Sequence, residues 1–309
     1  MNTFNFLNDI YGKLGTYKYL PFWFFTPLRI IVRNIANWYF PKYLTPKKII
    51  QNNREKDLIV SLTSFPARIN DVWMVIECLK RQTVLPEKIM LWLSKDQFPS
   101  NDSIPEKLVQ EQDDLFSIVM VDGDIRSHKK YYYAVKYYSE KSFITCDDDI
   151  FYDNRMIERL LKTSKLYPKC IIANKTSQMV FAKNGVSPYK NWYDNKTPFS
   201  HVDLIQIGLC GVFYPAGCLH SMVTNDVLFM KLAPYADDIW LNAMARLKGT
   251  PVVQSSEIRY PLEIVSESPS LTDINNGENK NDLQIEQIRN YLLNNDFDDV
   301  YFKSLFDNM

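Results

Sequence analysis

Apolar runs and amphipathic segments alternate along residues 57–170. The apolar runs are short and apolar on both faces, which predicts buried strands at 58–64, 88–94, 116–122 and 142–146. The segments between them repeat apolar residues at helical spacing or carry helix-start signals, which predicts helices at 71–82, 129–140 and 154–167. Buried strands separated by helices are typical of a mostly parallel sheet covered on both sides. We therefore predict an α/β, Rossmann-like fold with residues 51–170 as its first half.

The pattern changes after residue 170, and residues 171–309 are predicted to form a second half with a polar tail. Short strands are predicted at 170–174 and 178–183, followed by a polar, aromatic loop at 184–203. The remaining elements are an apolar segment and three helices, expected at 204–215, near 225–232, at 237–249 and at 283–294.

The first 50 residues form an aromatic, amphipathic extension. Within residues 19–40 the apolar run is too short for a spanning helix, and Pro21 and Pro27 interrupt it. A helix is predicted from Leu28 onward. Its apolar face carries Leu28, Ile31, Ile35 and Trp38. A second, more polar face carries Arg29, Arg33 and Asn37. Such a segment fits a membrane interface and fits equally well a helix packed on the main domain.

Composition narrows the function classes. Lys+Arg and Asp+Glu both number 36, so the chain shows no excess of positive charge that would point to nucleic acid. Five scattered cysteines without a C-x-x-C pair fit reduced thiols rather than zinc ligands, and no secretory signal pattern opens the chain. These features predict a cytoplasmic protein. If residues 19–40 bind lipid, they would attach the protein peripherally to the inner face of the cell membrane.

Polar residues gather at the carboxyl ends of the predicted strands, where open parallel sheets bind ligands. They are Thr63, Ser64 and Arg68 after the first strand, Asp122 and Asp124 after the third, and Asp147, Asp148 and Asp149 after the fourth. Asp147 and Asp149, two positions apart, can face one side and share Mg²⁺ or Mn²⁺, which prefer hard oxygen ligands. The alternative is an aspartate-rich turn.

Two helix starts carry unusual charge. Lys129 and Lys130 oppose the dipole of the predicted helix 129–140, which favours a ligand-binding role over a solvated helix start. Asp237 and Asp238 open the helix 237–249, where acids also serve as ordinary caps.

The motifs "DLIVSLTSFPARI", "DGDIRSHKKYYYA", "FITCDDDIFY", "GVFYP" and "ADDIW" together resemble bacterial GT-A-fold glycosyltransferases of surface-polysaccharide (capsule or O-antigen) biosynthesis, from about residue 57 to about residue 282. The resemblance implies a GT-A-like fold and a metal-dependent enzyme that moves a sugar from a nucleotide-diphosphate donor, such as a UDP-sugar, to a glycan or lipid-linked acceptor. The acid in "ADDIW" favours inversion at the sugar, although retaining GT-A enzymes can also place an acid there, and the resemblance does not identify the donor.

The resemblance also implies roles for single residues. Asp147 and Asp149 correspond to the D-x-D that holds Mn²⁺ or Mg²⁺, and Asp238 to the general base, with Asp237 as its helper. The expected donor contacts are Thr63, Ser64, Arg68, Asp122, Asp124, Lys129, Lys130, Asp147 and Asp148. Because aromatic faces stack on sugars, Trp192, Tyr193 and Tyr214 are the expected acceptor contacts, with loop packing as the alternative.

Two other functions share part of this pattern. A nucleotidyltransferase that makes a nucleotide-sugar would have the same sheet and acids. However, such enzymes usually carry a glycine-rich loop after the first strand, and here the loop reads "TSFPARI". A non-catalytic carbohydrate-binding protein would need the aromatic residues but not the acid clusters.

Overall fold

The fold is built around one sheet that takes strands from both predicted halves. In this computed structural model the structure describes residues 3–16, 22–47, 54–183, 185–195, 203–255, 260–266 and 280–301. The sheet has seven strands in the order β12-β5-β11-β4-β1-β2-β3. Their bounds are β1 Arg54–Thr63, β2 Leu85–Ser94, β3 Phe116–Val121, β4 Ser142–Thr145, β5 Ile171–Ala173, β11 Val212–Tyr214 and β12 Val252–Gln254. Only β11 runs antiparallel to its neighbours within this sheet.

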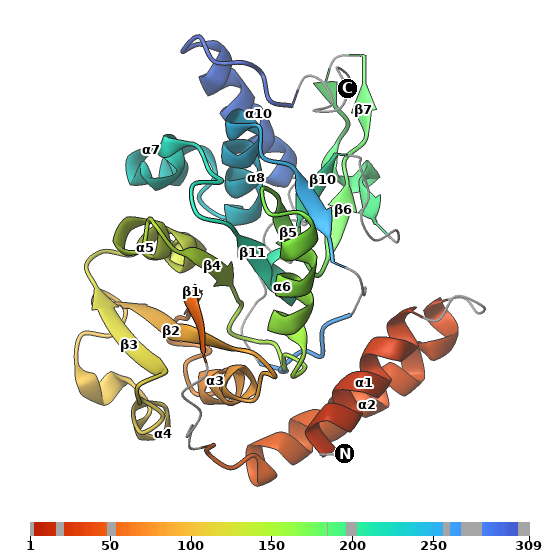
Figure 1. Cartoon of the computed structure of the whole chain (residues 1–309), viewed down its shortest axis with the longest axis vertical. Coiled ribbons are helices and arrows are strands. Elements are labelled where there is room, and N and C mark those ends of the chain that lie inside the picture. The colour runs from red at the N-terminus through yellow and green to blue at the C-terminus, as the bar shows by residue number, and fades with distance from the viewer. Residues whose placement is uncertain are drawn as a thin grey trace.

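Helices cover both faces of the sheet (Figure 1), and they follow the predicted alternation. Their bounds are α3 Val72–Lys80, α4 Glu106–Val109, α5 Lys129–Tyr137, α6 Met156–Leu166, α7 Asp226–Leu232, α8 Asp237–Lys248 and α10 Lys280–Leu293. The α/β class with a mostly parallel sheet flanked by helices is therefore confirmed.

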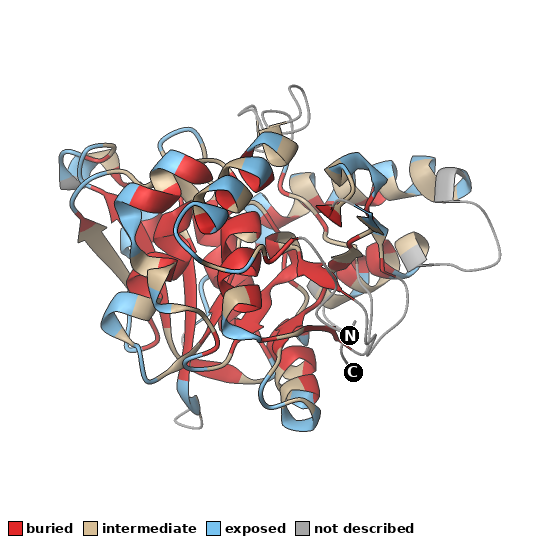
Figure 2. Cartoon of the chain, turned by 90° about the horizontal axis from the view of Figure 1, so that it is seen from above, coloured by how far each residue is buried: buried red, intermediate tan, exposed pale blue. Residues whose placement is uncertain are grey.

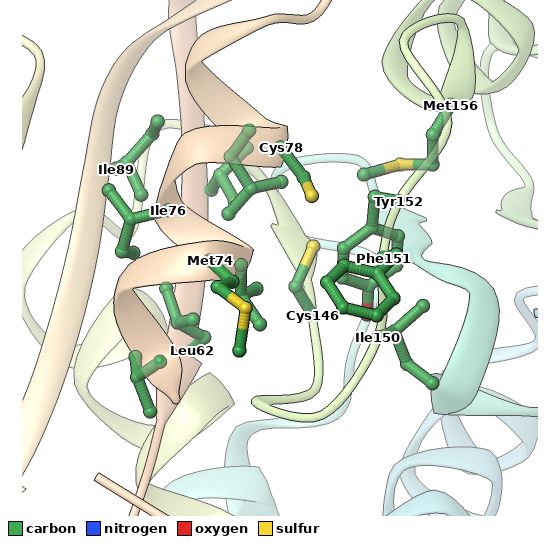
Figure 3. Packing of buried hydrophobic residues seen from close by; sticks show 14 of the residues in the cluster. Leu62, Met74, Ile76, Cys78, Ile89, Cys146, Ile150, Phe151, Tyr152 and Met156 are labelled. Atoms are coloured by element: carbon green, nitrogen blue, oxygen red, sulfur yellow. The ribbon is translucent and has the colours of Figure 1, made fainter. Parts of the chain in front are cut away.

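The core has two layers because alternate residues of each central strand face opposite sides. In β1, Leu58, Val60 and Leu62 pack with α3 and α6, whereas Ile59 belongs to the layer under α5 and α8. Figure 2 shows buried residues through the sheet and on the inner sides of the helices. Figure 3 shows part of the first layer, in which Cys78 and Cys146 are buried free thiols, as the sequence predicts.

The segment between β5 and β11 is more finely divided than predicted. The single strand expected at 178–183 is two strands, β6 (Thr176–Gln178) and β7 (Phe181–Ala182). β6 pairs with β9 (Tyr193–Asp194) and β10 (Leu204–Gln206), and β7 pairs with β8 (Gly185–Val186). Residues 184–203, predicted as a loop, therefore contribute two short strands and a 3₁₀ turn, and residues 184 and 196–202 lie outside the described residues.

The N-terminal extension is a pair of helices that lie side by side along one edge of the molecule (Figure 1). They are α1 (Thr3–Thr16) and α2 (Phe22–Tyr43). The prediction that the helix starts at Leu28 is wrong: α2 begins six residues earlier and contains Pro27. Proline removes a single backbone donor, and packing of α2 against α1 and the core offsets that loss. Among the described residues no helix is long and apolar enough to cross a membrane.

Candidate active site

The carboxyl ends of β1 and β4 bring four predicted residues together. The two strands are parallel and Ser61 pairs with Thr145, so the segments that follow them leave the sheet at the same edge. Ser64 Oγ donates to Asp148 Oδ2 at 2.5 Å. Arg68 Nη1 donates to Asp148 Oδ1 at 3.0 Å and to Asp149 Oδ2 at 2.6 Å. One guanidinium thus offsets two of the three adjacent acids.

Lys130 offsets the third acid and joins it to helix α8. Its Nζ donates to Asp147 Oδ1 at 2.8 Å and forms an ion pair with Asp237 Oδ2, also at 2.8 Å. Burial would lower the pKa of Lys130, but the charges of Asp147, Asp237 and Asp238 raise it well above its usual value. Lys130 is therefore a fixed cation between the strand-end acids and the helix-start acids.

Lys129 lies beside Lys130 in sequence but has a different partner. Its buried Nζ pairs with Asp124 Oδ1, and Gln97 Nε2 donates to Asp124 Oδ2 at 2.9 Å. Asp122 lies outside this network, because its side chain is 90% exposed and pairs with Lys95. Of the two acids predicted after the third strand, Asp124 is thus the one bound into the buried network.

Asp238 sits next to Lys130 without capping its own helix. The N-cap residue of α8 is Ala236, and it makes no side-chain capping hydrogen bond. Instead, Asp238 Oδ2 accepts the backbone N–H of Gly208 at 2.9 Å. Loss of solvation raises the pKa of Asp238 to about 7; the charge of Asp237 adds to the rise and that of Lys130 opposes it. The residue as a whole remains partly exposed.

Asp237 has the opposite electrostatic setting. Burial would raise its pKa, but Lys130 holds it below its usual value. Its Oδ2 lies 2.8 Å from Lys130 Nζ, so this buried carboxylate oxygen is ion-paired. The buried Tyr214 Oη, in contrast, has no hydrogen-bond partner among the described residues, and its pKa is raised by burial and by the charge of Asp238. Buried oxygens without partners are rare and mark places where a ligand group or water can bind.

The strand-end acids fit a divalent cation that completes its shell from a substrate. Asp147 and Asp149 are both partly exposed, and each uses one carboxylate oxygen for a cation of the protein. Burial raises the pKa of Asp149 to about 7, and the charge of Asp147 adds to the rise. No group of three or more metal-ligating side chains occurs among the described residues. In proteins Mg²⁺ is usually held by one or two carboxylates and takes its other ligands from phosphates and water, so Asp147 and Asp149 are the candidate ligands here.

The predicted aromatic and hydroxyl contacts are dispersed. Trp192 is buried and donates its Nε1 proton to Ser187 O at 2.8 Å, as in the loop-packing alternative. Tyr193 is exposed on β9, and Tyr214 stacks on Phe143 beneath the acids. Thr63 Oγ1 donates to Trp92 O at 2.8 Å, so its hydroxyl is used within the sheet.

Several residues of the site escape sequence reasoning. Ser61, in the middle of β1, donates its hydroxyl to the backbone carbonyl of Lys130 and so fixes the start of α5. Gly208 approaches so closely that a Cβ there would lie 3.1 Å from Asp238 Oδ1 and 3.2 Å from Lys130 Nζ. Tyr152 Oη accepts the backbone N–H of Asp147 at 2.8 Å. In the sequence, the only sign of such a close approach is the first glycine of "GLCGVFYP", Gly208, and a glycine does not indicate which side chain comes close.

A cavity of about 430 Å³ lies away from the acids, between the β8–Tyr189 segment and α10. Its lining includes Ser187, Pro188, Asp282 and Arg289 and none of the clustered aspartates. Asp282 Oδ1 accepts the backbone N–H of Tyr189 at 2.6 Å, so α10 is tied to the Tyr189 turn beside the cavity. The pKa of Tyr189 is raised by burial and, to a smaller extent, by the charge of Asp238.

Comparison with known proteins gives a likeness in fold. No family model and no curated protein matches the chain. Solved structures similar to it include 4-diphosphocytidyl-2C-methyl-D-erythritol synthase from Anaerococcus prevotii, with 14% identity, a TM-score of 0.40 and coverage of 66% of this chain and 88% of that one. UDP-glucose pyrophosphorylase from Acinetobacter baumannii shows 9% identity, a TM-score of 0.38 and coverage of 77% and 93%. Identities and TM-scores this low leave the reaction open, so a function has to be argued from the site.

Proposed function

We propose that the chain is a metal-dependent glycosyltransferase that moves a sugar from a nucleotide-diphosphate donor to a glycan or lipid-linked acceptor with inversion. The proposal rests on one observation: the ammonium of Lys130 forms ion pairs with both Asp147 and Asp237. A fixed ammonium between a two-carboxylate cation site and a second acid pair suits a reaction in which negative charge develops on a leaving diphosphate.

The residues have separate roles in this proposal. Asp147 and Asp149 would hold Mg²⁺ or Mn²⁺, which would neutralise charge at the diphosphate. Arg68 and Ser64 orient Asp148 and Asp149. Lys130 stabilises charge on the leaving group.

Asp238 is the base in this proposal. Its carboxylate takes the proton of the acceptor hydroxyl as that oxygen bonds to the anomeric carbon. The bond between the anomeric carbon and the diphosphate oxygen breaks, its electron pair leaves with the nucleoside diphosphate, and inversion follows from attack on the opposite face. A pKa of about 7 suits a base at neutral pH.

Nucleotidyl transfer to make a nucleotide-sugar is the second candidate. The similar solved structures are nucleotidyltransferases, and they agree better with this candidate than with glycosyl transfer. The local sequence favours glycosyl transfer, because residues 64–71 after β1 contain no glycine and their Arg68 is bound to acids.

Product analysis separates the candidates. The protein is incubated with Mn²⁺ and a panel of UDP-, GDP- and CDP-sugars, and in parallel with nucleoside triphosphates and sugar 1-phosphates. Glycosyl transfer predicts slow metal-dependent release of nucleoside diphosphate, through hydrolysis when no acceptor is present. Pyrophosphate formation from triphosphates would overturn the proposal in favour of nucleotidyl transfer, and binding of sugar without either product would leave a carbohydrate-binding protein.

A further inference from the structure

Helix α2 has two separate apolar faces. Val32, Ala36 and Phe40, four residues apart, are buried against the rest of the protein. A different face of the helix carries the exposed stripe of α2, which consists of Phe24, Leu28, Ile31, Ile35 and Trp38. Ile31 is 53% exposed and Trp38 57% exposed, although Ile is among the residues most often fully buried in soluble proteins and Trp is highly buried on average. A second apolar face of this length requires an explanation beyond core packing.

The sequence segment that carries the stripe has an excess of positive charge. Residues 1–53 contain seven Lys or Arg and one acid, Asp9, a net charge of +6 on a chain whose net charge is zero. Lys13 and Lys42 are exposed near the two ends of the helix pair, and Lys42 Nζ lies 4.4 Å from the centre of the Trp38 ring. Arg33, in contrast, faces the protein and pairs with Glu263.

We propose that the exposed stripe of α2 docks in the plane of an anionic lipid surface. Apolar and aromatic side chains would enter the interface while lysines contact lipid phosphates, as interfacial helices do. No described helix is suited to cross a membrane, so the contact is peripheral. A second copy of the chain is a poorer occupant, because two stripes in contact would bring two positively charged segments together.

The docked helix would be held firmly to the acid cluster. Asn37 Nδ2 donates to Glu263 O, and Val265 N donates to Asn37 Oδ1. Between these residues, Ile264 N donates to the carbonyl of Asp149 at 2.7 Å. A single segment, residues 262–265, therefore connects α2 to the strand-end acids. Docking would place the site at a constant height above the lipid surface.

The test is flotation of the full chain with vesicles. Phosphatidylcholine vesicles with and without phosphatidylglycerol are used, and binding is expected only with the anionic lipid. Replacing two stripe residues, Ile31→Ser with Ile35→Ser, should weaken binding at least about tenfold, since buried apolar area is lost at the interface. The matched control replaces two exposed apolar residues elsewhere, Leu166→Ser with Val227→Ser, which are 66% and 78% exposed, and should bind as the unaltered chain does.

Charge and self-association variants complete the test. Lys13→Gln with Lys42→Gln should weaken binding to anionic vesicles, and added salt should weaken binding of the unaltered chain. Thermal unfolding checks that each variant is folded. Failure of the full chain to float with anionic vesicles overturns the proposal. Equal binding by the stripe variant and its control also overturns it, and so does a dimer in sedimentation equilibrium that the stripe substitutions dissociate.

Discussion

Two acidic clusters meet at the same edge of the sheet, and different structures hold them. Asp147, Asp148 and Asp149 follow strand β4, and their charges are offset by Arg68 and Lys130, which come from other elements. Asp237 and Asp238 open helix α8, and they depend on Lys130 and on the backbone N–H of Gly208. In the sequence both clusters are simply runs of aspartate.

The two clusters differ in the solvent exposure and the pKa of their carboxylates. The strand-end acids lie at the open edge, and two of them keep partial exposure, which suits binding of a cation and phosphates. In the helix-start pair, Lys130 holds the pKa of Asp237 low, whereas burial and, to a smaller extent, the charge of Asp237 raise the pKa of Asp238. Neighbouring acids whose pKa values are pushed apart are typical of catalytic groups with separate roles. The predictions below test this division of roles.

The largest effect is expected from Asp238→Asn. The amide oxygen can still accept the Gly208 N–H, but the side chain can no longer take a proton, so transfer should fall about 10²–10⁴-fold while donor affinity stays unchanged. Steady-state kinetics and calorimetry with nucleoside diphosphate measure the two quantities. If Asp237→Asn abolishes transfer and Asp238→Asn is nearly silent, the roles within the pair are reversed.

Lys130→Met removes the cation that the two clusters share. Asp147 and Asp237 then lose a partner while they remain close together, so the free energy of unfolding should fall by about 3–5 kcal/mol. Urea denaturation measures this loss. The control is Lys136→Met on the exposed side of the same helix, which should stay within about 0.5 kcal/mol of the unaltered protein. Equal losses for the two variants would contradict the bridging role.

Asp149→Asn should affect the strand-end cluster alone. One of two charged cation ligands is lost, so Mn²⁺-dependent binding of nucleoside diphosphate should weaken at least about tenfold, as calorimetry can measure. Asp114→Asn, at an exposed site in the bend that precedes β3, is the matched control. Unchanged affinity in Asp149→Asn would remove the cation site from the proposal.

The smallest effect is a pH dependence that distinguishes the clusters. The pKa of Asp238 is raised to about 7 in the folded protein, so the base is protonated below that pH and kcat should fall about tenfold per pH unit as pH decreases. The residual activity of Asp238→Asn should lack this limb in a pH–rate profile. A limb that persists in the variant would assign the titration to another group.

Much of the fold was predictable, because strands apolar on both faces and helices with periodic apolar positions are local features. All four strands of the first half and the helices between them formed at or near the expected positions. The failures come from contacts between elements. The helix was predicted only from Leu28, but α2 begins before Pro27 because packing outweighs the loss of one hydrogen bond. The segment after β5 broke into short strands, of which β6 pairs with β9 and β10 and β7 pairs with β8.

The sequence by itself determined the sheet edge at which the polar residues gather, because parallel strands that end together place their following residues together. It also showed the apolar stripe of α2, since helical spacing is a property of the chain. Only the tertiary structure decided that Lys130 bridges the two acid clusters while Lys129 turns to Asp124, and that Asp238 meets Gly208 rather than capping its helix. These choices depend on charges and backbone amides brought together from distant segments, and a carboxylate's pKa depends on that assembled surrounding rather than on its neighbours in sequence.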